Sequence, residues 1–185
     1  MKFVKDNRER ENKLEQAYYK YAQGLYNTAF RLLQNNEDAL EIIQETFLKA
    51  LNGFSLFRNE AKIQTWLYRI VINLCYDRLK KDNRITYIPE EKIIFHIDKN
   101  ISATDPEFTK EQEEKILKIN KAIESLTLKQ KTIFTLKVYN ELSYEEIAKI
   151  MKVKVGTAKA TFFQTVGKLK NIIELMEKKN EINEI

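Results

Sequence analysis

The sequence predicts an all-α protein: two small helical domains joined by a flexible linker, the second containing a helix-turn-helix. Apolar residues recur at spacings of three and four along most of the 185 residues, which is the period of an amphipathic helix. Only 4 glycines and 2 prolines are present, and no two segments alternate as paired strands would. We expect the domains at residues 1–84 and 110–185, with residues 85–109 as the linker.

Three helices are expected in the first domain, at residues 12–33, 37–51 and 63–81. Each carries apolar side chains at helical spacing. The pair Asn35 and Asn36 interrupts the pattern between the first two helices, because asparagine favours helix ends over helix interiors. Three helices of this length are enough to enclose a small core.

Residues 85–109 have the composition of a linker. They contain both prolines of the chain and no sustained apolar period. Lysine and arginine outnumber aspartate and glutamate in the two flanking domains, whereas the segment around the linker is acidic. The formal net charge of +5 is therefore concentrated in two basic blocks, as binding to nucleic-acid phosphates requires.

The second domain is expected to contain a helical hairpin within residues 142–170. Ser143 and Glu146 form an S-x-x-E capping box, in which each side chain binds the backbone N–H of the other residue, so a helix should begin directly after Ser143. Thr127 and Gln130 offer a similar box to the preceding helix. The second helix of the hairpin should bury a stripe made of Val155, Ala158, Phe162, Val166 and Leu169.

This hairpin is typical of a helix-turn-helix, because its second helix leaves a polar and basic face pointing away from the core. Lysine suits phosphates, glutamine suits adenine and apolar side chains suit the thymine methyl group, so the face fits a major groove. Periodicity alone fits equally well an ordinary helical hairpin whose lysines are merely solvated. The rest of the chain has to decide between the two interpretations.

The chain shows no arrangement of catalytic or metal-binding residues. Its one histidine, His96, falls in the linker, and its one cysteine, Cys75, falls in an apolar run, so neither a zinc site nor a nucleophile with a partner base is indicated. The acidic residues are spaced for exposed helix faces rather than for binding Mg²⁺. We expect no enzyme activity, no cofactor and no metal. The lone cysteine, and the lack of a signal peptide or an apolar stretch of about 20 residues, predict a cytoplasmic protein without membrane insertion.

Two longer motifs carry a resemblance to a known family. Residues 57–79 read FRNEAKIQTWLYRIVINLCYDRL and match the pattern F-R-x-x-x-x-x-x-T-W-L-Y-R-I-x-x-N-x-x-x-D-x-L. Residues 142–159 read LSYEEIAKIMKVKVGTAK and are similar to L-S-Y-E-E-I-A-E-I-L-G-I-S-V-G-T-V-K. Both patterns, in this order, are those of the extracytoplasmic-function (ECF) sigma factors of bacterial RNA polymerase, which the chain resembles across both domains.

The resemblance implies a polymerase-binding face on the second helix. Residues 26–51 are similar to the family's helix pair with its acidic D-A-E-D-L-V-Q-E-x-F run, whose exposed face binds core polymerase. Without the resemblance, a merely solvated acidic face would be the favoured interpretation. The implied polymerase-binding residues are Asp38, Glu41, Gln44 and Glu45.

The resemblance also implies that the following loop and third helix open the minus-ten promoter element. There a single-stranded base is held out of the stack, which requires aromatic surface, hydrogen-bond donors and positive charge. Trp66 is an exception, because it lies on the apolar stripe of the third helix and should pack in the core. The implied DNA-binding residues are Phe57, Arg58, Lys62, Asn73, Arg78, Lys80 and Lys81.

For the second domain the resemblance implies a recognition helix in the major groove of the minus-thirty-five element. The family's S-R-x-x-R run is replaced here by Ala160, Thr161 and Gln164, so we expect a shifted sequence preference. Lys152 and Lys154 stand where the family often has Gly and Ser, which deprives the second helix of a serine cap. The expected contacts are Lys152, Lys154, Thr157, Lys159, Thr161, Phe163, Gln164 and Lys168.

Together these features predict an alternative sigma factor. It would bind core RNA polymerase, direct it to particular promoter DNA and assist promoter melting, with an anti-sigma factor left open as a further partner. The alternative is a conventional helix-turn-helix DNA-binding transcriptional regulator. That protein would bind duplex DNA tightly on its own, whereas a sigma factor needs the polymerase.

Overall fold

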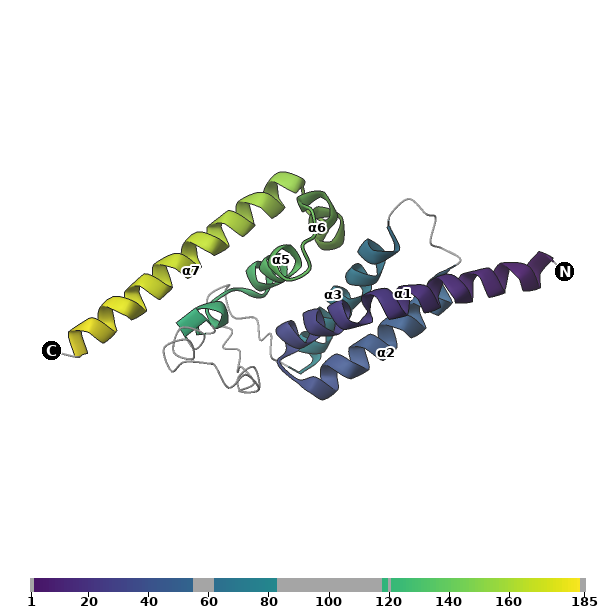
Figure 1. The fold of residues 1–185 in the computed structure, drawn as a ribbon, viewed down its shortest axis with the longest axis horizontal. Helices are drawn as coiled ribbons and strands as arrows, with labels where there is room; N and C mark the ends of the chain where they lie inside the picture. Colours follow the sequence, from purple (N-terminus) through teal and green to yellow (C-terminus); the bar gives the residue numbers. More distant parts are fainter. Residues whose placement is uncertain (1, 55–61, 83–117, 120, 184–185) are drawn as a thin grey trace, which may run out of the picture.

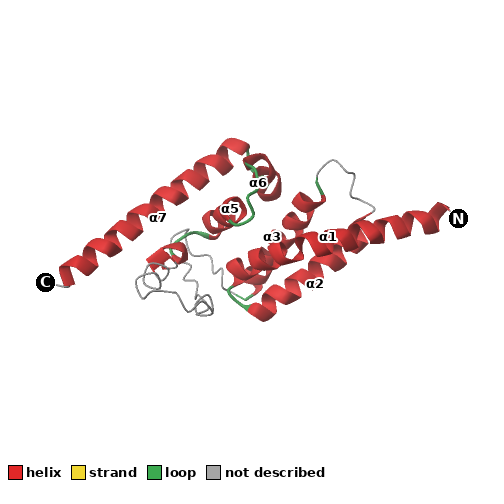
Figure 2. Cartoon of the chain, in the orientation of Figure 1, coloured by secondary structure: helices red, strands yellow, loops and turns green. Residues whose placement is uncertain are grey.

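The computed structural model describes residues 2–54, 62–82, 118–119 and 121–183, and it places the side chains of residues 12–54, 62–82, 118–119 and 121–176. Every regular element among the described residues is a helix (Figure 2), which confirms the all-α fold class. The segment 83–117, which contains the expected linker, lies outside the described residues. The helices are α1 (Lys2–Leu33), α2 (Asn36–Gly53), α3 (Ile63–Lys81), α5 (Leu128–Val138), α6 (Tyr144–Met151) and α7 (Val155–Asn183).

Helices α1, α2 and α3 pack together as the first domain (Figure 1). Asn35 caps α2, because its side-chain oxygen accepts the N–H of Asp38 at 2.9 Å. Trp66 is partly buried against the core, with its ring edge-to-face to that of Phe54 and the centroids 6.1 Å apart, which confirms its expected packing role. Fully buried side chains of this domain include Leu25, Ala29, Ile42, Leu67 and Val71.

Helix α1 is longer than the sequence predicts, since it begins at Lys2 rather than near residue 12. Residues 2–11 are mostly charged or polar, so they show no apolar period. Glutamate, lysine and arginine are nevertheless good helix formers, and a helix already begun extends at little cost. The extra turns therefore depend on propensity, which the search for an apolar stripe does not detect.

Two helices of the second domain, α5 and α6, begin at the predicted capping boxes. The Ser143 hydroxyl accepts the Glu146 N–H at 3.2 Å, and the Glu146 carboxylate accepts the Ser143 N–H at 3.0 Å. Thr127 and Gln130 make the matching pair of bonds at 3.3 and 3.1 Å. Both predicted helix starts are confirmed. Buried side chains of this domain include Ile133, Leu136, Ile147, Ala148 and Ala158.

The predicted buried stripe of α7 needs a correction. Ala158 and Leu169 are buried as expected, but Val155 is 41% and Val166 40% exposed. Thr165 is buried instead, and its hydroxyl is satisfied because it donates to the Thr161 carbonyl at 2.7 Å. The buried face of α7 is therefore narrower than a count of apolar residues suggests.

The two domains are in contact, which the sequence analysis did not foresee. Helix α3 packs on α6, and α1 packs on α5. Buried residues of both domains belong to one continuous hydrophobic cluster, which runs from Leu25 and Leu67 to Ile133 and Ile147. In Figure 1, α5 and α6 lie beside α3, whereas α7 extends away from the first domain. The contact brings the helix-turn-helix next to the start of α3.

Candidate nucleic-acid interface

The turn between α6 and α7 gives the helix-turn-helix its shape. Lys152 ends α6 in the left-handed conformation (φ 52°, ψ 46°), and its backbone N–H donates to the Ala148 carbonyl. A residue other than glycine pays about 1 kcal/mol for this conformation. Lys154 directly precedes α7, and its carbonyl accepts the Ala158 N–H at 3.1 Å, but its ammonium group cannot accept a capping hydrogen bond. Both lysine side chains are exposed at this turn.

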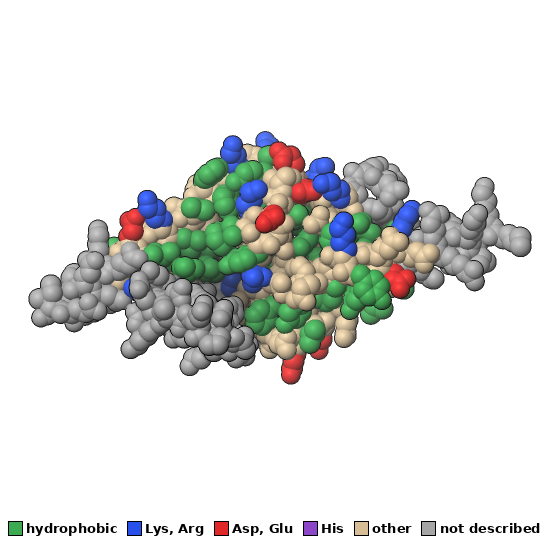
Figure 3. All heavy atoms as spheres, viewed as in Figure 1, with side chains coloured by type: hydrophobic (Ala, Val, Ile, Leu, Met, Phe, Trp, Pro, Cys, Tyr) green, Lys and Arg blue, Asp and Glu red, His purple; other side chains and the backbone are tan. Residues whose placement is uncertain are grey.

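The first turns of α7 present a polar face to solvent. Thr157, Lys159 and Gln164 are exposed, and Thr161 is half-buried. Phe163 is 57% exposed. In Figure 3, side chains coloured as Lys and Arg stand along the upper edge of the molecule, where Figure 1 places the meeting point of α6 and α7. By helical spacing, Thr157, Thr161 and Gln164 lie along one edge of the exposed side of α7 and Lys159 and Phe163 along the other, with the two turn lysines exposed just before them.

Phe163 is held in place by an aromatic cluster beneath it. Its ring meets that of Phe162 edge-on, with centroids 5.8 Å apart. Phe162 in turn stacks on Phe134 of α5 at 6.3 Å and meets Tyr144 of α6 at 5.9 Å. These contacts tie the outward face of α7 to the two helices behind it.

Lys168 lies apart from the other predicted reading residues. Its ammonium group donates to the carbonyl of Ser125 at 2.7 Å, so the side chain is directed toward its own domain. Ser125 directly follows residues 121–124, which are helical. In this structure Lys168 therefore connects α7 to the rest of the domain.

Along α3, three of the predicted minus-ten residues are exposed: Asn73, Lys80 and Lys81. Because Lys80 and Lys81 follow Asn73 by two helical turns, the three lie on one side of the helix. Lys62, just before α3, donates to the Glu146 carboxylate at 2.9 Å across the domain contact. This hydrogen bond lowers the pKa of Glu146 and raises the pKa of Lys62. Phe57 and Arg58, which are also predicted minus-ten residues, lie outside the described residues.

Arg78 is directed toward α2 and away from the other basic residues of α3. Its guanidinium group lies 2.6 Å from the Asp38 carboxylate and 2.5 Å from that of Glu41. The hydrogen bond to Glu41, followed by the charge of Asp38, raises the pKa of Arg78 against the opposing effect of burial. A predicted DNA-binding residue and two predicted polymerase-binding residues thus form one ion-pair cluster.

The remaining acidic face of α2 is only partly open. The Asp38 side chain is 13% exposed and that of Glu41 is 62% exposed. Gln44 is exposed, whereas Glu45 is half-buried and pairs with Lys49 at 3.3 Å. Of the four predicted polymerase-binding residues, Glu41 and Gln44 are therefore the most accessible.

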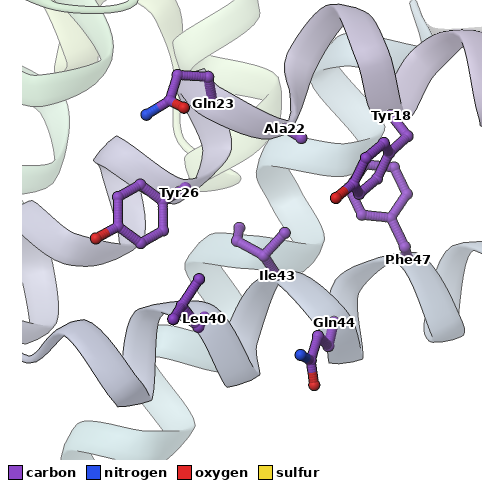
Figure 4. A pocket seen from close by; sticks show the side chains of 8 residues that line it. All are labelled: Tyr18, Ala22, Gln23, Tyr26, Leu40, Ile43, Gln44 and Phe47. Atoms are coloured by element: carbon purple, nitrogen blue, oxygen red, sulfur yellow. The ribbon is translucent and has the colours of Figure 1, made fainter.

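Beside this face a groove of about 340 Å³ lies between α1 and α2 (Figure 4). Leu40, Leu48 and Leu51 are exposed along α2, and Tyr18 is exposed on α1. The groove was not predicted from the sequence, although a signal is present: Leu40, which lines it, recurs with Leu48 and Leu51 at helical spacing, as a second apolar stripe beside the buried one. The groove is lined by Tyr18, Ala22, Gln23, Tyr26, Leu40, Ile43, Gln44 and Phe47.

Within the described ranges, no group of three or more His, Cys, Asp or Glu side chains could hold a metal ion. Among the helices of these ranges, none has both the length and the apolar character that crossing a bilayer needs. Cys75 is fully buried, and burial raises the pKa of its thiol. Its packing as a small apolar residue is as the sequence predicts.

Comparison with known proteins decides the family. The chain matches the family model described as Sigma-70 region 2 over residues 17–85 and that described as Sigma-70, region 4 over residues 116–169. It is 31% identical to RNA polymerase sigma factor SigV of Bacillus subtilis, covering 79% of this chain and 82% of that protein. It is also 31% identical to ECF RNA polymerase sigma factor SigW of the same organism, covering 75% and 77%. The chain belongs to the ECF sigma factors.

Solved structures share the fold of this sigma factor. The sigma factor RpoE from Bartonella quintana, in complex with the anti-sigma factor NepR, matches with a TM-score of 0.65 at 20% identity, covering 88% of this chain and 97% of that one. CnrH, in complex with the cytosolic domain of CnrY, matches with a TM-score of 0.64 at 15% identity, covering 89% and 90%. Region 2 of this sigma factor contains α2 and α3, and region 4 contains the helix-turn-helix.

Proposed function

We propose that this sigma factor directs core RNA polymerase to promoters by reading two DNA elements, one with each domain. It assists promoter melting without covalent chemistry of its own, and it acts in the cytoplasm, where the polymerase works. The observation that carries the proposal is the presence of both sigma regions in order, with an open polar face on α7. Holding two elements at once raises the effective concentration of each weak contact.

Core polymerase binds the exposed side of α2 in this proposal. Glu41 and Gln44 supply polar contacts, and Glu45 lies at the edge. The groove with Leu40, together with the exposed Leu48, supplies apolar area. Asp38 contributes mainly by holding Arg78, since its carboxylate is largely covered. This division of roles is supported by the exposure of each side chain.

The minus-ten element meets the region around α3. Asn73, Lys80 and Lys81 share one exposed side of the helix, which suits a base donor flanked by phosphate contacts. Phe57 and Arg58 would complete the pocket for the flipped base. Lys62 joins them once its contact with Glu146 is released.

The minus-thirty-five element meets α7 and the turn before it. Gln164 and Phe163 face solvent and can read adenine and the thymine methyl group, while Lys159, Thr157 and Thr161 lie on the same helix segment. Lys152 and Lys154 project from the turn toward flanking phosphates. Because this face lacks the family's arginines, its sequence preference differs from that of relatives that keep them.

A further partner is an anti-sigma factor. One solved structure with this fold, that of RpoE, contains the anti-sigma factor NepR, and another, that of CnrH, contains the cytosolic domain of CnrY. That supports a protein of this class as a regulator of the chain.

Run-off transcription with purified core polymerase tests the proposal. The full chain should give transcripts from a subset of a random promoter library, and polymerase alone should not. Leu40→Asp should lower the affinity for core polymerase at least tenfold, because it puts a charge on the apolar groove. The matched control is Leu175→Asp, the same change at an exposed leucine of α7, which should bind like the wild type. Tight binding of the chain alone to specific duplex DNA, without any effect on polymerase, would contradict the proposal.

A further inference from the structure

The exposed side of α3 carries an acidic residue among the residues proposed to bind DNA. Within α3, the exposed side chains are those of Asn73, Asp77, Lys80 and Lys81. Asp77 follows Asn73 by four positions and precedes the two lysines by three and four, so helical spacing places it between them on one side of the helix. A carboxylate therefore lies within the face that is proposed to meet the minus-ten element.

No basic neighbour on α3 neutralises this carboxylate. Lys80 and Lys81 stand at the spacing at which helical side chains can pair, but in the described part of α3 neither makes an ion pair with Asp77. The next residue, Arg78, is directed to α2, where its guanidinium group lies 2.6 Å from the Asp38 carboxylate. The Asp77 carboxylate is thus exposed and available to a group from another molecule.

An acidic side chain at this place is unfavourable in two respects. Aspartate is a poor helix former, and its negative charge lies close to the C-terminal end of α3 at Lys81, where the helix dipole disfavours it. The same charge repels DNA phosphates. Both effects can be offset if the carboxylate accepts a hydrogen bond that the neighbouring lysines, which only donate, do not provide.

The chemistry of the base edges indicates which base provides that hydrogen bond. An ionised carboxylate only accepts hydrogen bonds. Guanine presents the acceptors N7 and O6 in the major groove, and thymine presents the acceptor O4, so both repel a carboxylate. Adenine presents its amino group beside the acceptor N7, whereas cytosine presents the N4 amino group alone. Cytosine is therefore the base whose edge suits Asp77 best.

The spacing along α3 allows Asn73 and Asp77 to read separate bases. Four residues of α-helix rise about 6 Å. Neighbouring nucleotides of one strand are about 3.4 Å apart along the duplex. The two side chains therefore address positions one or two nucleotides apart, while Lys80 and Lys81, about one turn further along, are placed for phosphates.

We propose that Asp77 selects cytosine at one position of the minus-ten element. Its carboxylate accepts a hydrogen bond from the cytosine N4 amino group and repels the acceptor edges of the other bases. Lys80 and Lys81 supply attraction that does not depend on sequence, and Asp77 reduces that attraction while it discriminates. This inference rests on the proposed sigma-factor function, to which it adds a specificity-determining residue on α3.

Selection from promoters with a randomised minus-ten element tests this role. The full chain, bound to core polymerase, would be compared with Asp77→Ala and Asp77→Asn. The wild type should enrich cytosine at least tenfold over each other base at one position. Asp77→Ala should reduce that enrichment to less than threefold and leave the other positions unchanged. Asp77→Asn should change the preferred base to adenine, because an amide both donates and accepts.

The matched control is Glu15→Gln, which neutralises an exposed carboxylate on α1 and should leave every base preference unchanged. Lys80→Ala should weaken binding to all sequences alike without changing the preference for cytosine. Both Asp77 variants should bind unselected DNA at least as tightly as the wild type, and they should unfold at the same or a higher temperature, since each removes a negative charge near a helix end.

Identical base preferences in the wild type and both Asp77 variants would overturn the proposal. Weaker binding of Asp77→Ala to every sequence, with the preference for cytosine retained, would also overturn it, because Asp77 would then act on affinity alone. Failure of the wild-type chain to direct transcription would instead count against the proposed function. The two failures are therefore distinguishable.

Discussion

In the first domain, Arg78 reaches from α3 to the carboxylates of Asp38 and Glu41 on α2. In the second domain, by contrast, Lys152, Lys154 and Lys159 extend from the turn and from α7 into solvent. Both sets of residues are proposed to bind partners, but only the first set is already engaged with groups of its own domain. The difference shows two ways of preparing a charged surface.

An internal ion pair fixes the geometry of a surface before its partner arrives, at the cost of competing with that partner. An exposed lysine keeps its full charge for a polyanion and gains its energy from the release of counterions. We therefore expect substitutions in the first domain to change stability, and substitutions on α7 to change DNA binding. Four predictions test this contrast.

The largest expected effect concerns Lys131 of the second domain. Unlike the exposed lysines of α7, this lysine is buried. It is buried in α5, and burial lowers its pKa to about 8. The folded state thus binds protons less well than the unfolded state, so the free energy of unfolding should rise by up to roughly 3 kcal/mol as the pH increases from below 8 to 10.5. Denaturant unfolding across this range measures the rise.

The control for this prediction is a pair of variants on the same helix. Lys131→Met should be more stable than the wild type at pH 7 and should lose the difference above pH 10, whereas Lys129→Met, at an exposed position, should follow the wild-type profile. Parallel profiles of wild type and Lys131→Met would show that burial of the charge has no cost.

The second prediction concerns the ion-pair cluster. Arg78→Met should lower the free energy of unfolding by about 2 kcal/mol, because it removes two hydrogen bonds between charged groups and leaves Asp38 largely covered. A double-mutant cycle with Asp38→Asn should give a coupling above about 1 kcal/mol. The cycle with Glu41→Gln should give less, since that carboxylate is mostly exposed. Similar couplings in both cycles would contradict the structural difference between the two acids.

The third prediction separates the recognition of individual bases by α7 from the electrostatic attraction of α7 to DNA phosphates. Gln164→Ala should cost about 1–2 kcal/mol of discrimination at one base pair of the minus-thirty-five element, and little at others. Lys159→Ala should weaken binding to all sequences alike and reduce the salt slope by about one. Selection of promoters by the holoenzyme, at two salt concentrations, measures both. Selected sites that do not change with Gln164→Ala would remove Gln164 from the reading face.

The smallest effect is expected at the turn. Lys152→Gly should stabilise the second domain by about 1 kcal/mol, because glycine adopts the left-handed conformation without strain. Lys152→Ala retains a Cβ and should give no such gain. If Lys152 binds phosphate, both variants should lower the salt slope of DNA binding to the same extent. A gain in stability with alanine as well would indicate that charge, not backbone conformation, destabilises the turn.

Local sequence signals predicted much of the fold. The capping pairs at Ser143 and Thr127 fixed two helix starts, because each pair acts within four residues of chain. Apolar spacing placed the helices but overestimated the buried stripe of α7. It counted Val166 as buried, whereas the structure buries Thr165, whose hydroxyl is satisfied by its own helix.

The contact between the domains could not be predicted in this way. Asn140 reads as a turn residue, and its partners Thr28 and Tyr68 lie 112 and 72 positions away in the chain. The direction of Arg78 toward α2 was equally hidden, because a basic residue near a helix end fits DNA binding and ion pairing alike. Resemblance to a motif predicts which residues belong to a binding surface, whereas long-range packing determines which of those side chains remain accessible to a partner.

The glycine at position 24 has a consequence for how such a protein can evolve. A single methyl group added there would favour helix α1 locally while pressing against the Tyr68 hydroxyl, 2.8 Å away. The packing of the two domains against each other could then be altered by one small mutation, remote from every side chain proposed to recognise a promoter. Domain packing and promoter choice would in that case be inherited as separate traits.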